Sequence, residues 1–315
     1  MSQADVILPT ESTGEMPVVR SIKPLDLAEV LEKGLQDFRA MPTHVVFLCI
    51  IYPVIGLVLA WATVGYDLLP LLYPLAAGFA LVGPFAAIGA YELSRRRELG
   101  LDTSWKHAFD IIHSPSFWSL AALGLLLLAI FAVWLAVARG IYVANFGEFS
   151  DTAQRITGTQ FATEVLTTPQ GHHLIIIGNL VGFLFAVLAF SLSVVSFPLL
   201  LDRNVGVAVA IITSFKVILK NPVTMALWGL IVAVGLAMGF ATLLVGLAVV
   251  VPVLGHATWH LYRKVVEPDS RPRPEYHPRM RGERSAADFP VALFMPTSPA
   301  ERPGADRGSD PAARP

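Results

Sequence analysis

The stretch PVTMALWGLIVAVGLAMGFATLLVGLAVVVPVLGHATWHLY, residues 222–262, contains no Asp, Glu, Lys or Arg. As one α-helix it would be about 60 Å long, twice the roughly 30 Å of a bilayer's hydrocarbon core. We therefore predict two membrane-spanning helices, over residues 222–238 and 240–262, with a tight turn near residues 238–240. A re-entrant segment, leaving five spans in all, or a seventh span is also compatible with the pattern.

Four more apolar runs precede this stretch, and each has the roughly 20 residues that a helix needs to cross a bilayer. We expect an all-α fold, a polytopic transmembrane helical bundle of six spans. The four earlier spans are expected at residues 44–64, 68–91, 117–138 and 174–201. The membrane domain is predicted to cover residues 24–264, between a disordered tail at residues 1–23 and a disordered cytoplasmic tail at residues 265–315.

The composition agrees with a membrane protein. Hydrophobic residues make up 54% of the chain and charged residues 15%, against about 25% charged residues in soluble domains. The net charge of −1 gives no general attraction to nucleic acid, so no nucleic-acid partner is expected. Membrane lipids and another membrane protein are the partners that this composition favours.

Lys and Arg near the span ends set the orientation, because cytoplasmic loops carry an excess of them. The loop at residues 139–173 has only two, Arg139 and Arg155, against three acidic residues. The basic loops contain Arg95, Arg96, Arg97, Lys106, Arg203, Lys216, Lys220, Arg263 and Lys264. We expect a multi-pass protein of the bacterial inner (plasma) membrane with both termini in the cytoplasm.

A pattern of prolines recurs three times. An amphipathic segment ends at Pro42, Pro115 or Pro222, where a span begins, and the following span carries a second proline. Proline is tolerated in the first turn of a helix, where its missing N–H would have no partner anyway. The pattern predicts three repeated helical hairpins, each preceded by an interfacial amphipathic helix. Any three hairpins with basic ends, however, would align about as well.

His256 and His260 are the candidates for a metal or haem site. They are four residues apart and share one helix face. A haem between spans also needs a facing ligand on a second helix, and no other histidine is deep in a span. The alternative is a pair of hydrogen-bonded side chains at head-group level. We expect no bound cofactor.

Three other polar positions are expected to be structural. Asn179, in the fourth span and flanked by Gly178 and Gly182, is predicted to hydrogen-bond another helix rather than to line a permeation path. Glu92 and Asp202, just beyond the second and fourth spans, are predicted to cap helices or face solvent.

The C-terminal tail contains one apolar island, DFPVALFM, at residues 288–295. Its side chains Phe289, Leu293 and Phe294 are candidates for docking on a partner or on the protein's own cytoplasmic face. A chance cluster of apolar residues is the alternative.

No predicted span has a charged residue in its interior, whereas coupled transporters usually keep such groups there. The chain also has no phosphate-binding glycine loop, no zinc-protease motif and no nucleophile elbow. We therefore expect no enzymatic activity. A structural or interaction protein is favoured, and a channel or transporter with a path between repeated hairpins or a haem- or metal-binding protein is the alternative.

The segments VVSFPLLLDR (194–203), NPVTMALWGLIVA (221–233) and VVPVLGHATWHLYRK (250–264) resemble a bacterial family of predicted integral membrane proteins, domain-of-unknown-function family 2189. The resemblance extends from about residue 20 to the tail. It implies a proteobacterial inner-membrane location and the same multi-span fold, and it carries no catalytic residues.

Overall fold

The structure is a computed structural model that describes residues 16–41, 53–54, 56–57, 71–79, 83, 87–147, 158–242 and 245–269. Most of the predicted first span, nine residues of the predicted second span and the whole apolar island at residues 288–295 lie outside these residues.

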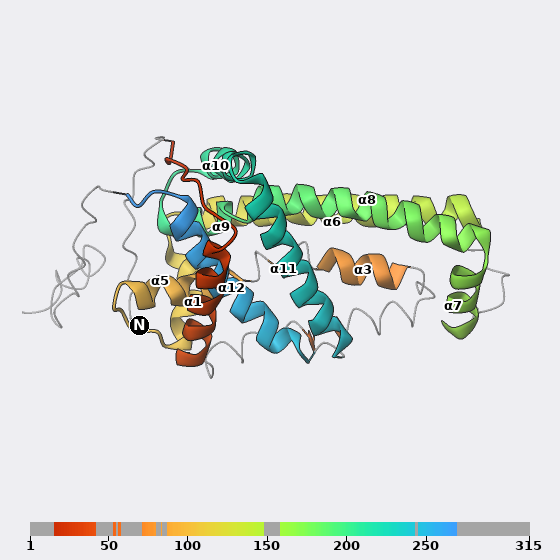
Figure 1. Cartoon of the computed structure of the whole chain (residues 1–315), viewed down its shortest axis with the longest axis horizontal. Helices are drawn as coiled ribbons and strands as arrows, with labels where there is room; N and C mark the ends of the chain where they lie inside the picture. The colour runs from red at the N-terminus through yellow and green to blue at the C-terminus, as the bar shows by residue number, and fades with distance from the viewer. Residues whose placement is uncertain are drawn as a thin grey trace, which may run out of the picture. The chain divides into compact units, whose positions relative to one another are not determined.

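The described part of the chain is helical, and Figure 1 shows its helices. An isolated bridge between Val19 and Val266 is the one extended pairing within it. The α-helices are α1 (Asp26–Ala40), α3 (Leu72–Phe79), α5 (Ile88–Glu98), α6 (Phe117–Phe146), α7 (Gly158–Thr167), α8 (Pro169–Ser193), α9 (Ser196–Asp202), α10 (Val207–Lys220), α11 (Pro222–Ala241) and α12 (Leu247–Val265), and η3 (Trp105–His113) is a 3-10 helix.

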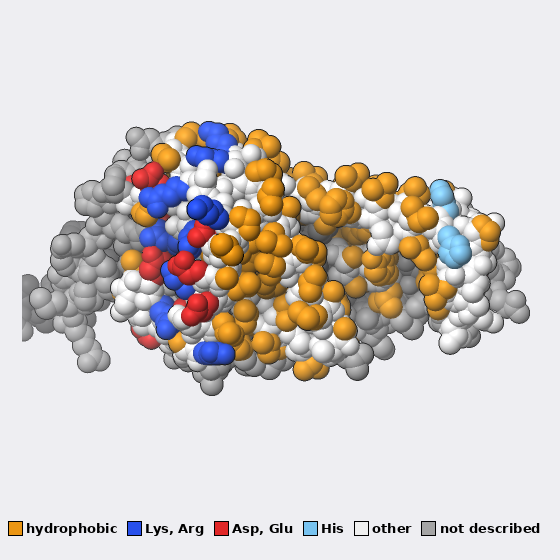
Figure 2. Space-filling view, in the orientation of Figure 1, with side chains coloured by type: hydrophobic (Ala, Val, Ile, Leu, Met, Phe, Trp, Pro, Cys, Tyr) orange, Lys and Arg blue, Asp and Glu red, His pale blue; other side chains and the backbone are white. Residues whose placement is uncertain are grey.

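Within the described part of the chain, three stretches of helix are long and apolar enough to cross a membrane: α6, the α8–α9 pair and α11. Each carries large hydrophobic side chains on its outside, such as Leu125, Phe183 and Leu230, which are 68%, 64% and 58% exposed. Figure 2 shows this apolar surface as a broad field beside a zone of charged side chains. So much exposed apolar surface is typical of contact with lipid rather than water. These helices therefore confirm an all-helical integral membrane protein.

The helix boundaries differ from the predicted ones. Helix α6 continues to Phe146, beyond the predicted end at residue 138, and α8 begins at Pro169 rather than at residue 174. The turn between α11 and α12 falls at residues 242–246 instead of 238–240. There the Thr242 hydroxyl oxygen accepts a hydrogen bond from the Gly246 N–H at 2.9 Å, and a Cβ at Gly246 would lie only 2.3 Å from that oxygen. This contact, which composition alone does not reveal, fixes the position of the turn.

The three amphipathic segments before the prolines are helices, as predicted. Helices α1, η3 and α10 end at Ala40, His113 and Lys220, and α11 begins at Pro222 itself. Each has a regular apolar face, because its hydrophobic residues recur with helical spacing.

Helices α1, α5, η3, α9 and the second half of α12 (residues 255–265) pack together where α6 begins and α8–α9 ends. We call this group the polar block. Helix α1 lies so close to α12 that a Cβ at Gly34 would stand 2.6 Å from the Cβ of Ala257. Large apolar side chains, including Phe197, Trp228 and Trp259, fill the core beside it. Most of the charged side chains visible in Figure 2 belong to this region.

Candidate functional site

Helix α5 is the centre of the polar block. Its sequence IGAYELSRRRE has a polar or charged side chain at nearly every position of its second half. Glu92, Ser94, Arg95 and Arg96 are nevertheless buried, between 0% and 5% exposed. Charged groups remain ionised in such surroundings only when they are paired. The contacts of α5 with its neighbours supply these pairs.

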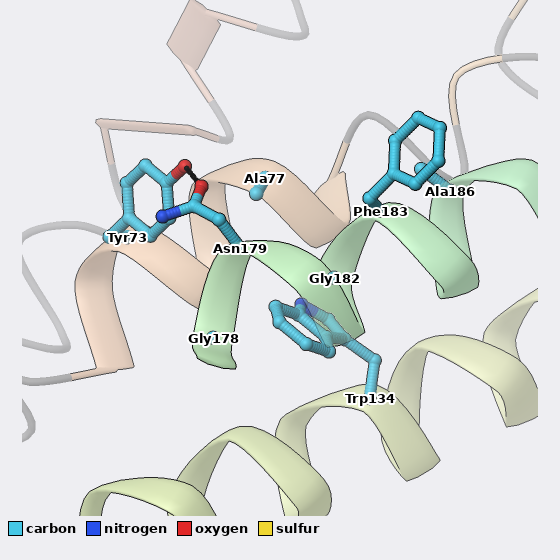
Figure 3. Close-up of a pocket in the computed structure, with 8 residues that line it drawn as sticks. All are labelled: Tyr73, Ala77, Trp134, Gly178, Asn179, Gly182, Phe183 and Ala186. Atoms are coloured by element: carbon cyan, nitrogen blue, oxygen red, sulfur yellow. Dashed lines mark hydrogen bonds between the residues drawn. The ribbon is translucent and has the colours of Figure 1, made fainter. Parts of the chain in front are cut away.

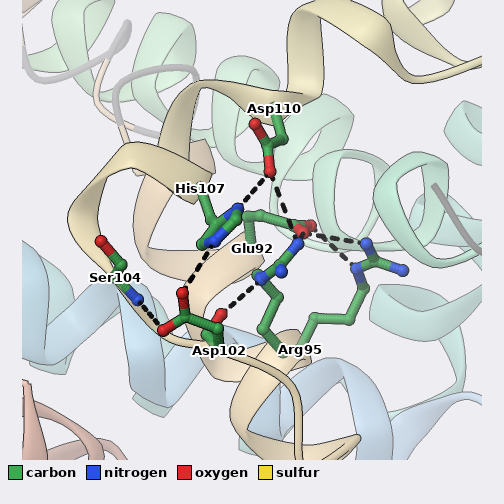
Figure 4. A network of polar contacts seen from close by, with 7 residues as sticks. Glu92, Arg95, Asp102, Ser104, His107 and Asp110 are labelled. Atoms are coloured by element: carbon green, nitrogen blue, oxygen red, sulfur yellow. Dashed lines mark hydrogen bonds and ion pairs between the residues drawn. The ribbon is translucent and has the colours of Figure 1, made fainter. Parts of the chain in front are cut away.

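The first set of contacts joins α5 to η3 (Figure 4). Arg95 donates two hydrogen bonds to the Glu92 carboxylate, from Nε at 2.8 Å and from Nη2 at 2.9 Å. Burial lowers the pKa of the Arg95 guanidinium, but the charge and hydrogen bonds of Glu92 and the charge of Asp202 together raise it by more, so Arg95 stays charged. Arg96 lies 3.8 Å from Glu92 and 3.5 Å from Asp110 of η3.

The loop between α5 and η3 is held by the same set. Arg96 Nε donates to the backbone oxygen of Asp102 at 2.6 Å. His107 lies between two carboxylates, with Nε2 at 3.0 Å from Asp102 and Nδ1 at 2.5 Å from Asp110. The backbone N–H of Ser104 and the His107 ring hold the pKa of Asp102 below its usual value. The short helix η3 is thereby fixed against α5.

The second set contains both candidate histidines. His260 Nε2 lies 2.9 Å from Asp37 Oδ2, and the Ser94 hydroxyl donates to the same oxygen at 2.5 Å. His256 Nδ1 lies 2.6 Å from Ser94 Oγ, and Arg97 donates to the other oxygen of Asp37. Because the single hydroxyl proton of Ser94 goes to Asp37, the hydrogen between Ser94 and His256 belongs to His256 Nδ1. Helices α1, α5 and α12 thus meet at one carboxylate.

This second set has the residue types of a catalytic triad but not its order. In a triad, histidine lies between the serine and the aspartate and takes the serine proton. Here Ser94 lies between His256 and Asp37, and these three residues are 1%, 0% and 5% exposed. The Ser94 hydroxyl is engaged with Asp37 and His256, and the set joins three helices. Burial raises the pKa of Asp37, but the hydrogen bonds from His260 and Ser94 and the electrostatic effect of His260 and His256 together lower it by more.

The third set joins α5 and α9 to the end of α12. The Tyr262 hydroxyl donates to Asp202 Oδ2 at 2.6 Å, and Arg263 lies 3.5 Å from the same oxygen. Arg263 also pairs with Glu98 of α5 at 2.8 Å, and Glu98 accepts a hydrogen bond from Trp259 Nε1 at 3.0 Å. The expectation that Glu92 and Asp202 are surface or capping residues is therefore wrong. Both are buried, at 2% and 4% exposed, because neighbouring helices supply their counter-charges.

The two ends of the described chain are joined beside the polar block. Arg20 N donates to Val265 O at 2.7 Å, and Glu267 N donates to Val18 O at 2.9 Å. Asn221, at the start of α11, accepts from Ile22 N at 2.8 Å and donates to Arg20 O at 3.0 Å. Residues 18–20 and 265–267 consequently lie side by side.

Asn179 lies in a different part of the fold, in a cavity of about 220 Å³ between α3, α6 and α8 (Figure 3). Its side-chain oxygen accepts a hydrogen bond from the Tyr73 hydroxyl at 2.7 Å, and its amide nitrogen donates to Ile175 O at 2.7 Å. A Cβ at Gly182 would lie 2.9 Å from the Trp134 ring, whereas one at Gly178 would meet nothing within 4 Å. The contact with Tyr73 joins α3 to α8.

The structure thus brings together His256 and His260, leaves Asn179 apart from them, and does not describe Phe289, Leu293 and Phe294. Among the residues it describes, no group of three or more His, Cys, Asp or Glu side chains is arranged to hold a metal ion. The partners of the histidines and of α5 were not predicted from the sequence. The one available signal was the spacing of Glu92 from Arg95 and Arg96, at three and four residues, which suits ion pairs on a helix.

Comparison with known proteins gives one match. No curated protein and no solved structure is significantly similar to the chain. Residues 72–202 match a family model described as predicted integral membrane protein (DUF2189). The match covers α3 to α9, including the Asn179 cavity and helix α5, and ends before α10 and α12. Residues 72–202 of the chain are therefore similar to the DUF2189 family of predicted integral membrane proteins.

Proposed function

We propose that the protein is a membrane-anchored interaction protein. Its apolar helices hold it in the bilayer, and its polar block presents both terminal segments at one place to another membrane protein. The observation that carries this proposal is the pairing of residues 18–20 with residues 265–267, next to interlocking ion pairs. A rigid support of this kind is suited to positioning a docking segment, because it restricts the motion of the backbone from which the segment extends.

The proposed topology has six spans, with the polar block and both termini in the cytoplasm of a bacterium with an inner membrane. Helix α6 leads away from the polar block and α8 returns to it, so the two cross in opposite directions. Lys and Arg are concentrated on the side of the polar block, as expected for the cytoplasmic side. The three amphipathic helices α1, η3 and α10 support a repeated architecture in which each precedes a hairpin.

The docking segment is proposed to be residues 288–295, with Phe289, Leu293 and Phe294 as its anchors. Deleting these eight residues should remove a partner that remains with the full-length protein during purification in mild detergent. Deleting residues 304–311, the same number of residues from the same tail, is the matched control. Retention of every partner after the first deletion would show that the segment does not dock.

Transport is the second candidate, because the Asn179 cavity lies beside the membrane helices α6 and α8. Flux of a solute into liposomes carrying the protein, abolished by Gly178→Leu, would favour a path through this cavity. Gly140→Leu in α6 is the control, since a Cβ there also meets nothing within 4 Å.

A haem or metal site is less well supported. One ring nitrogen of each histidine is already engaged, His256 Nδ1 with Ser94 and His260 Nε2 with Asp37. A metal bound to these nitrogens would have to replace these contacts. Equal metal and pigment content in the wild type and in a His256→Ala/His260→Ala variant would eliminate this site.

A further inference from the structure

Helix α10 has two different sides. Ala210, Thr213, Ser214 and Val217 are buried against the rest of the fold. On the opposite side a second apolar row is open, with Ile212, Phe215 and Leu219 exposed by 46%, 37% and 77%. The spacing of three and four residues places this row along one line of the helix. A helix in water would not leave such a row uncovered.

The neighbours of α10 fix its level relative to the membrane. The α8–α9 stretch, which is apolar enough to cross the bilayer, ends at Asp202, and α11, which is also apolar enough to cross, begins at Pro222. Helix α10 connects these two ends, with Asn221 alone between it and α11. In Figure 1 it is viewed nearly along its axis, whereas α6 and α8 lie across the picture. It therefore runs across the axis of the membrane helices at the level where they end.

The charges of α10 lie on one flank of the open row. Lys216 and Lys220 are exposed and, at 100° per residue, fall between the open row and the buried side. Lys220 Nζ donates one hydrogen bond to Val19 O at 2.8 Å, which leaves further N–H groups of the ammonium for other acceptors. Figure 2 shows Lys and Arg side chains over α10 at the border between the charged zone and the apolar surface.

We propose that α10 is an interfacial helix that binds anionic phospholipid. Its open apolar row enters the bilayer at the boundary between head groups and acyl chains, to a depth of about 5–10 Å. Lys216 and Lys220 then lie at the level of the lipid phosphates and select anionic over zwitterionic lipid. The inference does not depend on the proposed docking of the tail, because it concerns a different surface.

The depth is measured with a fluorophore on a Leu219→Cys variant in a Cys49→Ser background, reconstituted in lipid nanodiscs. We expect stronger quenching by phosphatidylcholine with a spin label at acyl carbon 5 than at carbon 12. The same fluorophore on a Glu32→Cys variant, at an exposed position of α1, should be quenched by neither lipid. An unquenched, water-exposed signal at position 219 would overturn the proposal.

The lipid preference is measured by titrating the full-length protein in detergent with phosphatidylglycerol or phosphatidylcholine and recording native mass spectra. Each surface lysine near anionic lipid contributes about 1 kcal/mol, so Lys216→Gln should weaken phosphatidylglycerol binding about fivefold. Binding of phosphatidylcholine should not change. Lys33→Gln, on α1, is the control, because Lys33 is paired with Glu29. Equal phosphatidylglycerol binding in the wild type and Lys216→Gln would overturn the role of the lysines.

Discussion

Replacing Glu92 by glutamine removes the carboxylate next to which Arg95 and Arg96 are buried. Arg95 loses the charge partner of two hydrogen bonds, at 2.8 and 2.9 Å, and Arg96 loses a partner at 3.8 Å. All three residues are at most 5% exposed, so water cannot replace the lost charge. Breaking a buried ion pair by removing one partner costs about 3–5 kcal/mol. Glutamine keeps one acceptor oxygen, which places the expected loss near the lower end, at about 3 kcal/mol.

The assay is thermal unfolding in detergent, followed by tryptophan fluorescence, since Trp228 and Trp259 lie in the core beside the polar block. In soluble domains of about 150–250 residues, 1 kcal/mol shifts Tm by about 2–4 °C. Glu92→Gln should therefore lower Tm by about 6–12 °C. Glu32→Gln, at an exposed position of α1, should stay within about 0.5 kcal/mol of the wild type. Equal Tm values for the two variants would refute the reasoning that α5 depends on buried charge pairs.

Three further predictions concern the polar block and its packing. The pKa of Asp37 is lowered in the folded protein, so the stability that Asp37 contributes is present above about pH 4 and is lost as the pH falls further. The Asp37→Asn variant should therefore lose less Tm than the wild type when the pH is lowered below about 4. A plot of Tm against pH with the same shape for both proteins would contradict this. Gly34→Ala should destabilise the protein by about 1–3 kcal/mol, because the added Cβ would clash with α12. Gly140→Ala, in α6 with open space around the added Cβ, should be neutral or stabilising. Similar Tm shifts for the two variants would contradict the close packing of α1 on α12. Tyr262→Phe should cost about 1.5–3 kcal/mol in the same assay through the lost hydrogen bond to Asp202, and a wild-type Tm would show that this bond contributes nothing.

The membrane helices could be predicted because their signal is local. A run of about 20 residues without charge has few alternatives to a membrane span. This identified α6, α8 and α11, although the helices α6 and α8 extend several residues beyond the predicted spans. The amphipathic helices α1, η3 and α10 were predicted for a similar reason, because their apolar residues recur with helical spacing and a proline follows each.

The polar block could not be predicted because its signal is not local. The Arg95–Arg97 run resembles the basic loop that follows a span, and hydropathy counts every charge as exposed. Arg95 and Arg96 are buried because Asp202 and Asp110, from two other helices, lie near them, and Arg97 pairs with Asp37 of a third helix. Likewise, the shared face of His256 and His260 was visible in their spacing. Their partners Ser94 and Asp37 lie 162 and 223 positions away along the chain.

The central claim is that α6 and α8 cross the membrane with the polar block on the cytoplasmic side. It is tested by labelling cells with a membrane-impermeant maleimide. Single cysteines are placed in a Cys49→Ser background at Lys33 in α1 and at Gln160 in α7, both exposed positions. The account predicts that the Gln160→Cys variant is labelled from outside the inner membrane and that the Lys33→Cys variant is labelled only after the membrane is disrupted. Labelling of both from outside, or protection of both, would contradict it.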